Sequence, residues 1–167
     1  NSHYIGVTAT PIPRTIAGTL MERYHTHSLT KCFIDKTFGG ELLMEEVGRR
    51  RLFEKIQLCL SEHRQFLIIC PLVEQTDAEG FEHLISVETL YANLTAHFGD
   101  HFRHVHAKRS TEDNATALKA VQNNEVKGLI ASTAVEVGID LSHLQTLIVF
   151  HPERFGLTTL HQLRGRI

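Results

Sequence analysis

The chain has 167 residues, of which 42% are hydrophobic and 22% charged, and its formal net charge is −2. This length and composition are typical of one folded globular domain rather than of a disordered segment. The charge balance gives no bulk indication of a nucleic-acid-binding protein. The sequence has no run of ~20 consecutive apolar residues, the length that a membrane span needs. The N-terminus lacks the pattern of a secretory signal. We therefore expect no membrane partner.

The cysteines indicate the compartment. The chain has three cysteines, Cys32, Cys59 and Cys70, and no two of them form a C-x-x-C motif. Cys59 and Cys70 lie in apolar runs. Free thiols of this kind behave as small hydrophobic groups and are typical of a reducing environment. We expect a cytoplasmic protein.

Short continuous apolar runs predict the strands. They cover residues 4–7, 66–70, 128–131 and 147–150, and a weaker strand is expected at 104–107. Continuous rather than alternating runs are typical of strands covered on both faces, as in a parallel sheet. Segments with helical spacing lie between them: 52–60, 84–98, a helix opening at Ser110 or Thr111, and one beginning near Thr158 or Thr159. The alternation predicts an α/β layered domain with right-handed crossovers.

Residues 1–45 fit this pattern less well, because Pro11 and Pro13 interrupt regular structure and Gly39-Gly40 indicates a turn. We interpret them as the end of a preceding unit plus a linker. The chain stops at residue 167, inside an expected helix, so we interpret it as a fragment.

Three segments combine the residue types that bind phosphate and nucleotide. TATPIPRT (8–15) and ASTAVEVGID (131–140) each follow a predicted strand, and ERFGLTTLHQLRGR (153–166) spans the last helix. Ligands of open α/β sheets bind beyond the carboxyl ends of the strands. The first two segments are expected at that edge, and the third reaches it if its helix packs alongside.

On these residues the chain resembles the superfamily 2 helicases, and within them the RecG branch of branched-DNA translocases. TATPIPRT is similar to motif III, residues 133–140 to motif V, and residues 162–166 to the start of motif VI. Residues 66–75 (FLIICPLVEQ) are similar to the opening of the second RecA-like lobe in that branch. Ala107 departs from the family pattern, which usually has glycine after the preceding histidine.

The resemblance implies a fold, a domain division and an activity. The fold would be a RecA-like (P-loop NTPase-type) three-layer domain with a mainly parallel central sheet. Residues 1–45 would be the end of the first helicase lobe and a linker, and residues 46–167 the second lobe, truncated within motif VI. The parent protein would be an ATP-dependent DNA helicase or translocase that acts on forked or branched DNA in replication-fork rescue, recombination and repair.

The nucleotide side of the site is expected in motifs V and VI. Arg166 is the candidate arginine finger, because a permanently charged planar guanidinium matches phosphate oxygens. Gln162 and Arg164 would lie toward the nucleotide, although each is equally an ordinary surface residue of a helix. Asp140, after Gly138 in a tight turn, would contact the ribose or hold a motif VI arginine; alternatively it caps the turn.

The DNA side is expected in motifs III and V. The candidates are Thr8, Thr10, Arg14, Ser132, Thr133 and Glu136. The two motif V hydroxyls would contact a DNA phosphate, which positions DNA without reading its sequence. Glu136 would face the neighbouring lobe or solvent. The motif III threonines, Thr8 and Thr10, would link the nucleotide state to DNA binding; alternatively, they cap a strand end. Arg14 would bind the DNA backbone or pair with an acidic side chain.

The chain contains no G-x-x-x-x-G-K-[ST] loop and no acidic magnesium motif ahead of residue 8. ATP and Mg²⁺ would therefore be bound mainly by the first lobe of the parent chain. The fragment alone is expected to be inactive and without a cofactor.

Two further features have functional and ordinary interpretations. Arg49-Arg50-Arg51 is a possible phosphate contact, but such a run is more often a solvated helix face. The histidines at 97, 101, 104 and 106, with Asp100, have spacings that could hold a metal. Surface histidines are the commoner outcome, and the sequence predicts no metal site.

Two alternative functions stay open. Transcription-repair coupling translocases share motif III and the Leu-His-Gln-Leu-Arg-Gly-Arg segment. Glu153-Arg154-Phe155-Gly156 favours the RecG branch, because coupling factors usually have Asp-His-Phe-Gly there. The other alternative is a catalytically inactive helicase-like interaction module. The family resemblance also implies a bacterial, nucleoid-associated protein.

Overall fold

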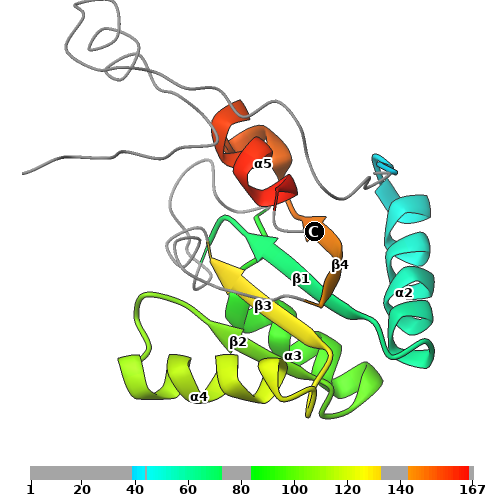
Figure 1. Ribbon diagram of the computed structural model, residues 1–167. Helices are drawn as coiled ribbons and strands as arrows, with labels where there is room; N and C mark the ends of the chain where they lie inside the picture. Colours follow the sequence, from blue (N-terminus) through cyan, green and yellow to red (C-terminus); the bar gives the residue numbers. More distant parts are fainter. Residues whose placement is uncertain (1–38, 44, 73–83, 133–142, 166–167) are drawn as a thin grey trace, which may run out of the picture. The chain divides into compact units, whose positions relative to one another are not determined.

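The computed structural model describes residues 39–43, 45–72, 84–132 and 143–165 (Figure 1). The helices and strands described fall in residues 44–167, the second of two units into which the chain divides. Four strands form one sheet in the order β2-β3-β1-β4, with every neighbouring pair parallel. They are β1 (Gln65–Cys70), β2 (Phe102–Val105), β3 (Gly128–Ser132) and β4 (Leu144–Val149).

Helices cover both faces of this sheet (Figure 1). They are α2 (Glu45–Ser61), α3 (Val87–Phe98), α4 (Thr111–Gln122) and α5 (Leu157–Arg164), with a short 3-10 helix η2 (Pro152–Arg154) before α5. From β1 the chain crosses the sheet, past the position of β3, to β2 at the edge. It then crosses back in the opposite direction from β2 to β3. Right-handed crossovers of opposite direction place α3 and α4 on opposite faces. The predicted parallel α/β architecture is confirmed.

The core lies on both sides of β1, whose six residues are all buried. Leu67 and Ile69 belong to a cluster with Val121 of α4 and Leu163 of α5. Phe66 points to the opposite face, where its ring meets Phe102 edge-on with centroids 5.8 Å apart. Burial on two faces explains why the run is continuously apolar.

Serine side chains fix where two helices begin. Ser86 Oγ accepts a hydrogen bond from the Thr89 N–H at the start of α3, and Ser110 Oγ accepts one from the Asp113 N–H at the start of α4. Each bond satisfies a backbone donor that has no partner within the helix. The expected α4 start at Ser110 or Thr111 is therefore confirmed.

We expect Ser110→Ala to lower the free energy of unfolding by about 1 kcal/mol, because the Asp113 N–H loses its cap. Urea unfolding followed by circular dichroism measures this loss. Ser61→Ala is the matched control, since the exposed Ser61 hydroxyl only donates to the Leu58 carbonyl at the end of α2. Equal stability of Ser110→Ala and wild type would contradict the capping role.

The predicted strand at 104–107 is wrong by two residues, because β2 covers Phe102–Val105. Phe102 is fully buried and packs on Phe66 and Phe98, which places the strand start earlier. His106 lies beyond the strand because Asn114 binds its backbone on both sides. The Asn114 side chain accepts from the His106 N–H at 3.3 Å and donates to the His106 carbonyl at 3.0 Å.

Other boundaries shift for similar local reasons. β4 covers Leu144–Val149 rather than 147–150, because Leu144 already pairs with Gln65. α5 begins at Leu157 after Gly156, ahead of the expected threonines, and ends at Arg164 with Gly165 as its C-cap. The expected strand at 4–7 lies outside the described residues. None of the described helices has the length and apolar character needed to cross a membrane.

Candidate functional site

The carboxyl edge of the sheet is where the predicted motifs V and VI leave the strands. The structure describes three of the predicted site residues there: Ser132, Gln162 and Arg164. The remaining candidates lie outside the described residues: Thr8, Thr10, Arg14, Thr133, Glu136, Gly138, Asp140 and Arg166. Their roles stay predictions.

Ser132 is the last residue of β3 and is 2% exposed. Its Oγ atom is buried and has no hydrogen-bond partner among the residues that the structure describes. Ser132 pairs with Cys70 in the parallel register, two residues beyond the Ile68–Ile130 pair on the same face. The hydroxyl is thus buried in this structure, and a contact with a DNA phosphate would require it to become accessible.

A tight turn carries the chain from β4 into α5. The Phe150 N–H still donates to the Ile69 carbonyl at 2.9 Å, and His151 then adopts a left-handed backbone with φ of 53°. Such a backbone is uncommon for a residue other than glycine. His151 Nδ1 lies 3.2 Å from the Glu153 Oε1 atom. The backbone N–H of Glu153 itself holds the pKa of this carboxyl below its ordinary value, and His151 adds to the effect.

α5 combines a buried anchor with exposed polar residues. Leu163 is 1% exposed and packs in the cluster with Leu67 and Ile69, whereas Gln162 and Arg164 are exposed. The Arg164 Nη2 atom lies 3.3 Å from His161 Nδ1 on the same helix. In Figure 1, α5 lies beyond the carboxyl ends of β1 and β4. The packing of α5 thus meets the condition under which the last segment was expected to reach this edge.

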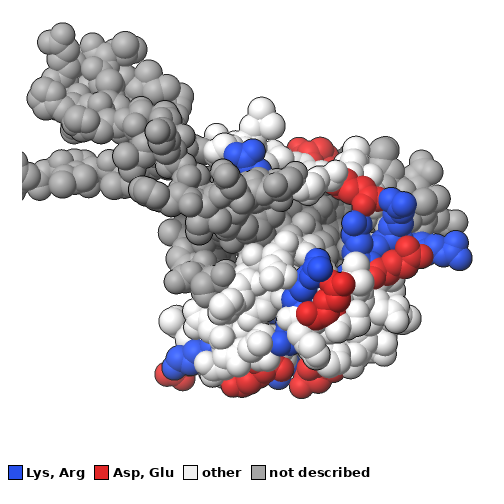
Figure 2. Space-filling view, turned by 45° about the vertical axis from the view of Figure 1, so that its right-hand side comes forward, with Lys and Arg blue, Asp and Glu red and all other residues white. Residues whose placement is uncertain are grey.

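The basic run on α2 is exposed, as expected of a solvated helix face. Arg49, Arg50 and Arg51 are all exposed, while Leu52 and Ile56 of the same helix are buried. Figure 2 shows acidic and basic side chains interspersed over the visible face rather than one basic patch. The possible phosphate contact of this run stays untested.

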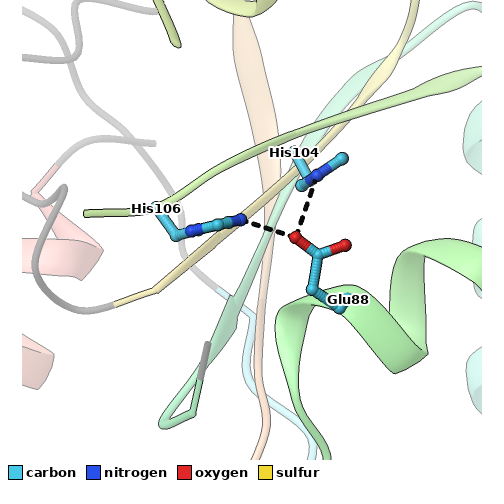
Figure 3. Close-up of side chains that lie close together, drawn as sticks. All are labelled: Glu88, His104 and His106. Carbon is cyan, nitrogen blue, oxygen red and sulfur yellow. Dashed lines mark hydrogen bonds and ion pairs between the residues drawn. The ribbon is translucent and has the colours of Figure 1, made fainter. Parts of the chain in front are cut away.

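Of the histidines with metal-ligand spacing, the structure brings His104 and His106 together, whereas His97 and Asp100 have other partners. His97 packs its ring against Phe53 and Phe98, and Asp100 pairs with Arg103 instead of a histidine. His104 and His106 instead meet Glu88 from the first turn of α3 (Figure 3). Sequence reasoning did not name Glu88, because nothing local to residue 88 indicates its distant partners.

The charges around His104 act in opposite directions. Burial lowers the pKa of its imidazole below the ordinary value, and Arg109 and His106 lower it further, whereas Glu88 raises it. Burial also raises the pKa of the Cys70 thiol, at the end of β1, to about 12. Cys70 is thus an inert core residue rather than a nucleophile.

The model of the helicase conserved C-terminal domain family matches residues 48–167. The chain is 33% identical over 166 residues to the ATP-dependent DNA helicase RecG of Acidithiobacillus ferridurans, covering 99% of this chain and 24% of that protein. It is 30% identical to the ATP-dependent DNA helicase RecG of Staphylococcus aureus strain NCTC 8325, over 96% of this chain and 23% of that protein. The SWI2/SNF2 ATPase C-terminal domain of Sulfolobus solfataricus superposes with a TM-score of 0.42 and 15% identity, over 60% of this chain and 48% of that chain.

The chain belongs to the helicase conserved C-terminal domain family, and its described part is a parallel α/β domain. Within that family its sequence is RecG-like over nearly its whole length. It spans about a quarter of the length of these relatives.

Proposed function

We propose that residues 46–167 form the second RecA-like lobe of an ATP-dependent DNA helicase or translocase that acts on forked or branched DNA. Residues 1–45 then supply the end of the first lobe and the linker. The observation that carries this proposal is the family match over residues 48–167 together with the RecG similarity over 99% of the chain. Replication-fork rescue, recombination and repair are the processes that such an activity serves.

The nucleotide side of this proposal rests on α5. Leu163 anchors the helix in the core, so Gln162 and Arg164 occupy fixed positions on an exposed helix beyond the sheet edge. Arg166 follows α5 directly and acts as the arginine finger on the γ-phosphate when the lobes close. Gly138 and Asp140 complete the nucleotide contacts from motif V.

The DNA side is assigned to motifs III and V. Thr8 and Thr10 couple the nucleotide state to DNA binding, and Arg14 binds the DNA backbone. Ser132 and Thr133 contact a DNA phosphate, and Glu136 contacts the neighbouring lobe. The Ser132 hydroxyl is buried and has no hydrogen-bond partner in the described part of the chain. Its contact with DNA therefore requires the hydroxyl to become accessible when the lobes close on DNA.

ATP and Mg²⁺ are bound mainly by the first lobe, since this chain has no phosphate-cradling glycine loop. The chemistry that the bound nucleotide supplies is phosphoryl transfer to water, for which positioning and charge stabilisation dominate. The partners are the first lobe of the parent chain and DNA, and the site of action is the bacterial nucleoid in the cytoplasm.

The proposal is tested by ATP turnover of the parent protein with and without forked DNA. We expect forked DNA to stimulate turnover more than a linear duplex of equal length, and the 167-residue chain alone to be inactive. Absence of turnover in the parent protein would support the inactive interaction module instead. Equal stimulation by linear duplex, with binding to RNA polymerase, would favour the transcription-repair coupling translocase.

A further inference from the structure

Glu88, His104 and His106 bring three potential metal-ligand atoms together near the end of β2. The Glu88 Oε1 atom lies 2.6 Å from His106 Nε2 and 3.3 Å from His104 Nε2. All three atoms lie within 4.8 Å of one another (Figure 3). His104 and His106 project to the same side of the chain because they are two residues apart, and Glu88 faces them from α3.

No placement of the proton on the His104 ring allows both Arg109 and Glu88 to form a hydrogen bond with His104 Nε2. Arg109 Nη1 lies 3.3 Å from His104 Nε2 and can only donate, so it requires a lone pair on that nitrogen. The Glu88 carboxylate is also 3.3 Å from the same nitrogen and requires a proton there. Either tautomer of His104 therefore leaves one contact mismatched.

His106 has a similar mismatch. Its ring is buried, and its Nε2–H donates to Glu88 at 2.6 Å. Its Nδ1 atom is then a buried acceptor without a hydrogen bond in the part of the chain that the structure describes. Buried polar atoms of this kind are uncommon, and a metal bound at Nε2 would leave Nδ1 in the same position, as a donor instead of an acceptor.

We propose that Glu88, His104 and His106 bind one divalent transition-metal ion, with Zn²⁺ as the representative ion. The ion accepts lone pairs from Oε1 and both Nε2 atoms, so the Glu88–His104 contact no longer needs a shared proton. Arg109 Nη1 then has only the His104 carbonyl, and not Nε2, as an acceptor among these groups. Two imidazoles and one carboxylate are a donor set that Zn²⁺ takes in sites with an open fourth position. This inference does not depend on the proposed helicase function.

Two of the three ligand separations are known, and both lie near those of such an ion; the third, between the two histidine nitrogens, is within 4.8 Å. Ligand distances of ~2.0–2.1 Å in a tetrahedral site separate the ligand atoms by about 3.3 Å. The Glu88–His104 pair already has this separation, and the Glu88–His106 pair needs to open from 2.6 Å. The Glu88 side chain is 44% exposed, so it has room to move.

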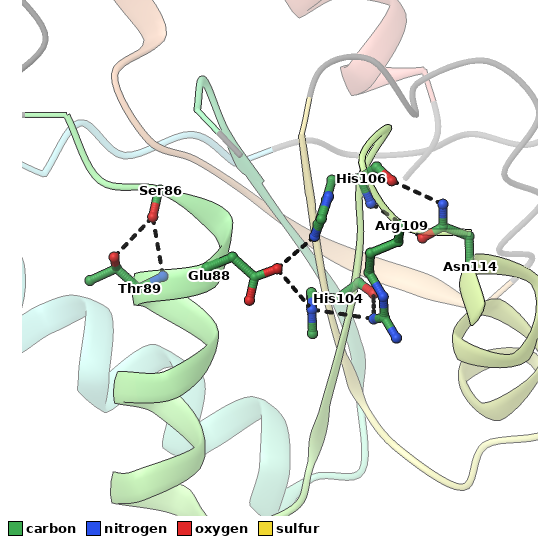
Figure 4. Close-up of polar contacts among 7 residues, drawn as sticks. All are labelled: Ser86, Glu88, Thr89, His104, His106, Arg109 and Asn114. Carbon is green, nitrogen blue, oxygen red and sulfur yellow. Dashed lines mark hydrogen bonds and ion pairs between the residues drawn. The ribbon is translucent and has the colours of Figure 1, made fainter. Parts of the chain in front are cut away.

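The backbones of the three ligands are held from several directions (Figure 4). Ser86 caps the turn of α3 that carries Glu88, and Asn114 of α4 binds the His106 backbone on both sides. Arg109 donates to the His104 carbonyl at 2.6 Å, a bond that metal binding leaves intact. The site is thus largely preformed, which reduces the ordering cost of binding.

Two features limit the affinity. The Arg109 guanidinium places a positive charge beside the ion, and the described residues provide no acceptor for His106 Nδ1–H. Loss of an outer partner of a metal ligand typically weakens binding by about 10–100-fold. We therefore expect weaker binding than in a structural zinc site.

The test is titration of the purified, metal-free protein with Co²⁺ and then Zn²⁺. We expect one equivalent of Co²⁺ to produce visible absorption of a low-coordinate site and Zn²⁺ to displace it. Glu88→Gln and His104→Gln should each weaken binding by at least about tenfold, the lower end of what outer-shell changes cause. His106→Gln should do the same, but its ring is buried, so circular dichroism must first confirm that it folds.

His101→Gln is the matched control, because His101 is an exposed histidine just before β2 and outside the cluster. It should bind the metal as the wild type does. No binding near one equivalent to wild type would overturn the proposal. Wild-type affinity in both Glu88→Gln and His104→Gln would overturn it too, because the ion would then be bound by other histidines.

Discussion

Arg166→Ala in the parent protein is expected to lower DNA-stimulated ATP turnover by about 10³-fold, the lower end of the effect of arginine fingers. In the proposed role, the guanidinium stabilises charge that develops on the transferred phosphoryl group, and alanine would leave that charge without its partner. The loss corresponds to about 4 kcal/mol of transition-state stabilisation. Steady-state ATPase assays with saturating forked DNA measure it.

Arg64→Ala is the control for this experiment. Arg64 precedes β1 at the amino end of the strand and pairs with Glu62 at 2.6 Å, with both side chains well exposed. Exposed pairs of this kind contribute little, so both stability and turnover should stay at the wild-type level. Forked-DNA binding should be retained in both variants. Unchanged turnover in Arg166→Ala would remove this residue from the mechanism.

Gly128→Ala is expected to lower the free energy of unfolding by about 1–3 kcal/mol, the usual cost of overpacking a core. A Cβ atom at this position would lie 2.6 Å from Phe102 Cδ1 and 2.8 Å from Phe66 Cζ. Both rings are fully buried, so they cannot move aside without disturbing their neighbours. Thermal unfolding should show a Tm lower by about 2–12 °C for a chain of this length.

A second substitution tests the cause of this loss. Phe102→Leu removes the ring edge nearest to the added methyl, so the double variant should be more stable than the sum of the two single losses predicts. Couplings between contacting residues are about 0.5–3 kcal/mol. Gly165→Ala is the control, since its Cβ would meet backbone atoms at an ordinary 3.5 Å. Strictly additive losses would contradict the steric explanation.

Patterns within a few residues predicted most of the fold. The apolar run at 66–70 predicted β1 because both faces of this strand are buried. Ser110 predicted the start of α4 because its side chain binds an N–H three residues ahead. The strand at residues 104–107 was misplaced because its end depends on Asn114, which binds the His106 backbone from another element.

The candidate site divides in the same way. The sequence predicted that the last segment reaches the carboxyl edge only if its helix packs alongside, and the buried Leu163 shows that α5 packs in this way. The sequence did not predict that Ser132 is buried, with no hydrogen-bond partner within the described ranges, because its burial depends on packing around the sheet. The functional roles of motif residues outside the described parts stay predictions from family resemblance.

The sequence by itself determined the parallel α/β domain, the order of its elements and the family to which it belongs. These properties follow from periodic burial, local caps and contiguous motifs, all of which act over short stretches of chain. Only the tertiary structure decided that Glu88 meets His106, 18 residues away, and that Gly128 lies against two phenylalanine rings. Such contacts depend on how crossovers pack helices and strands together, and no local pattern encodes that packing.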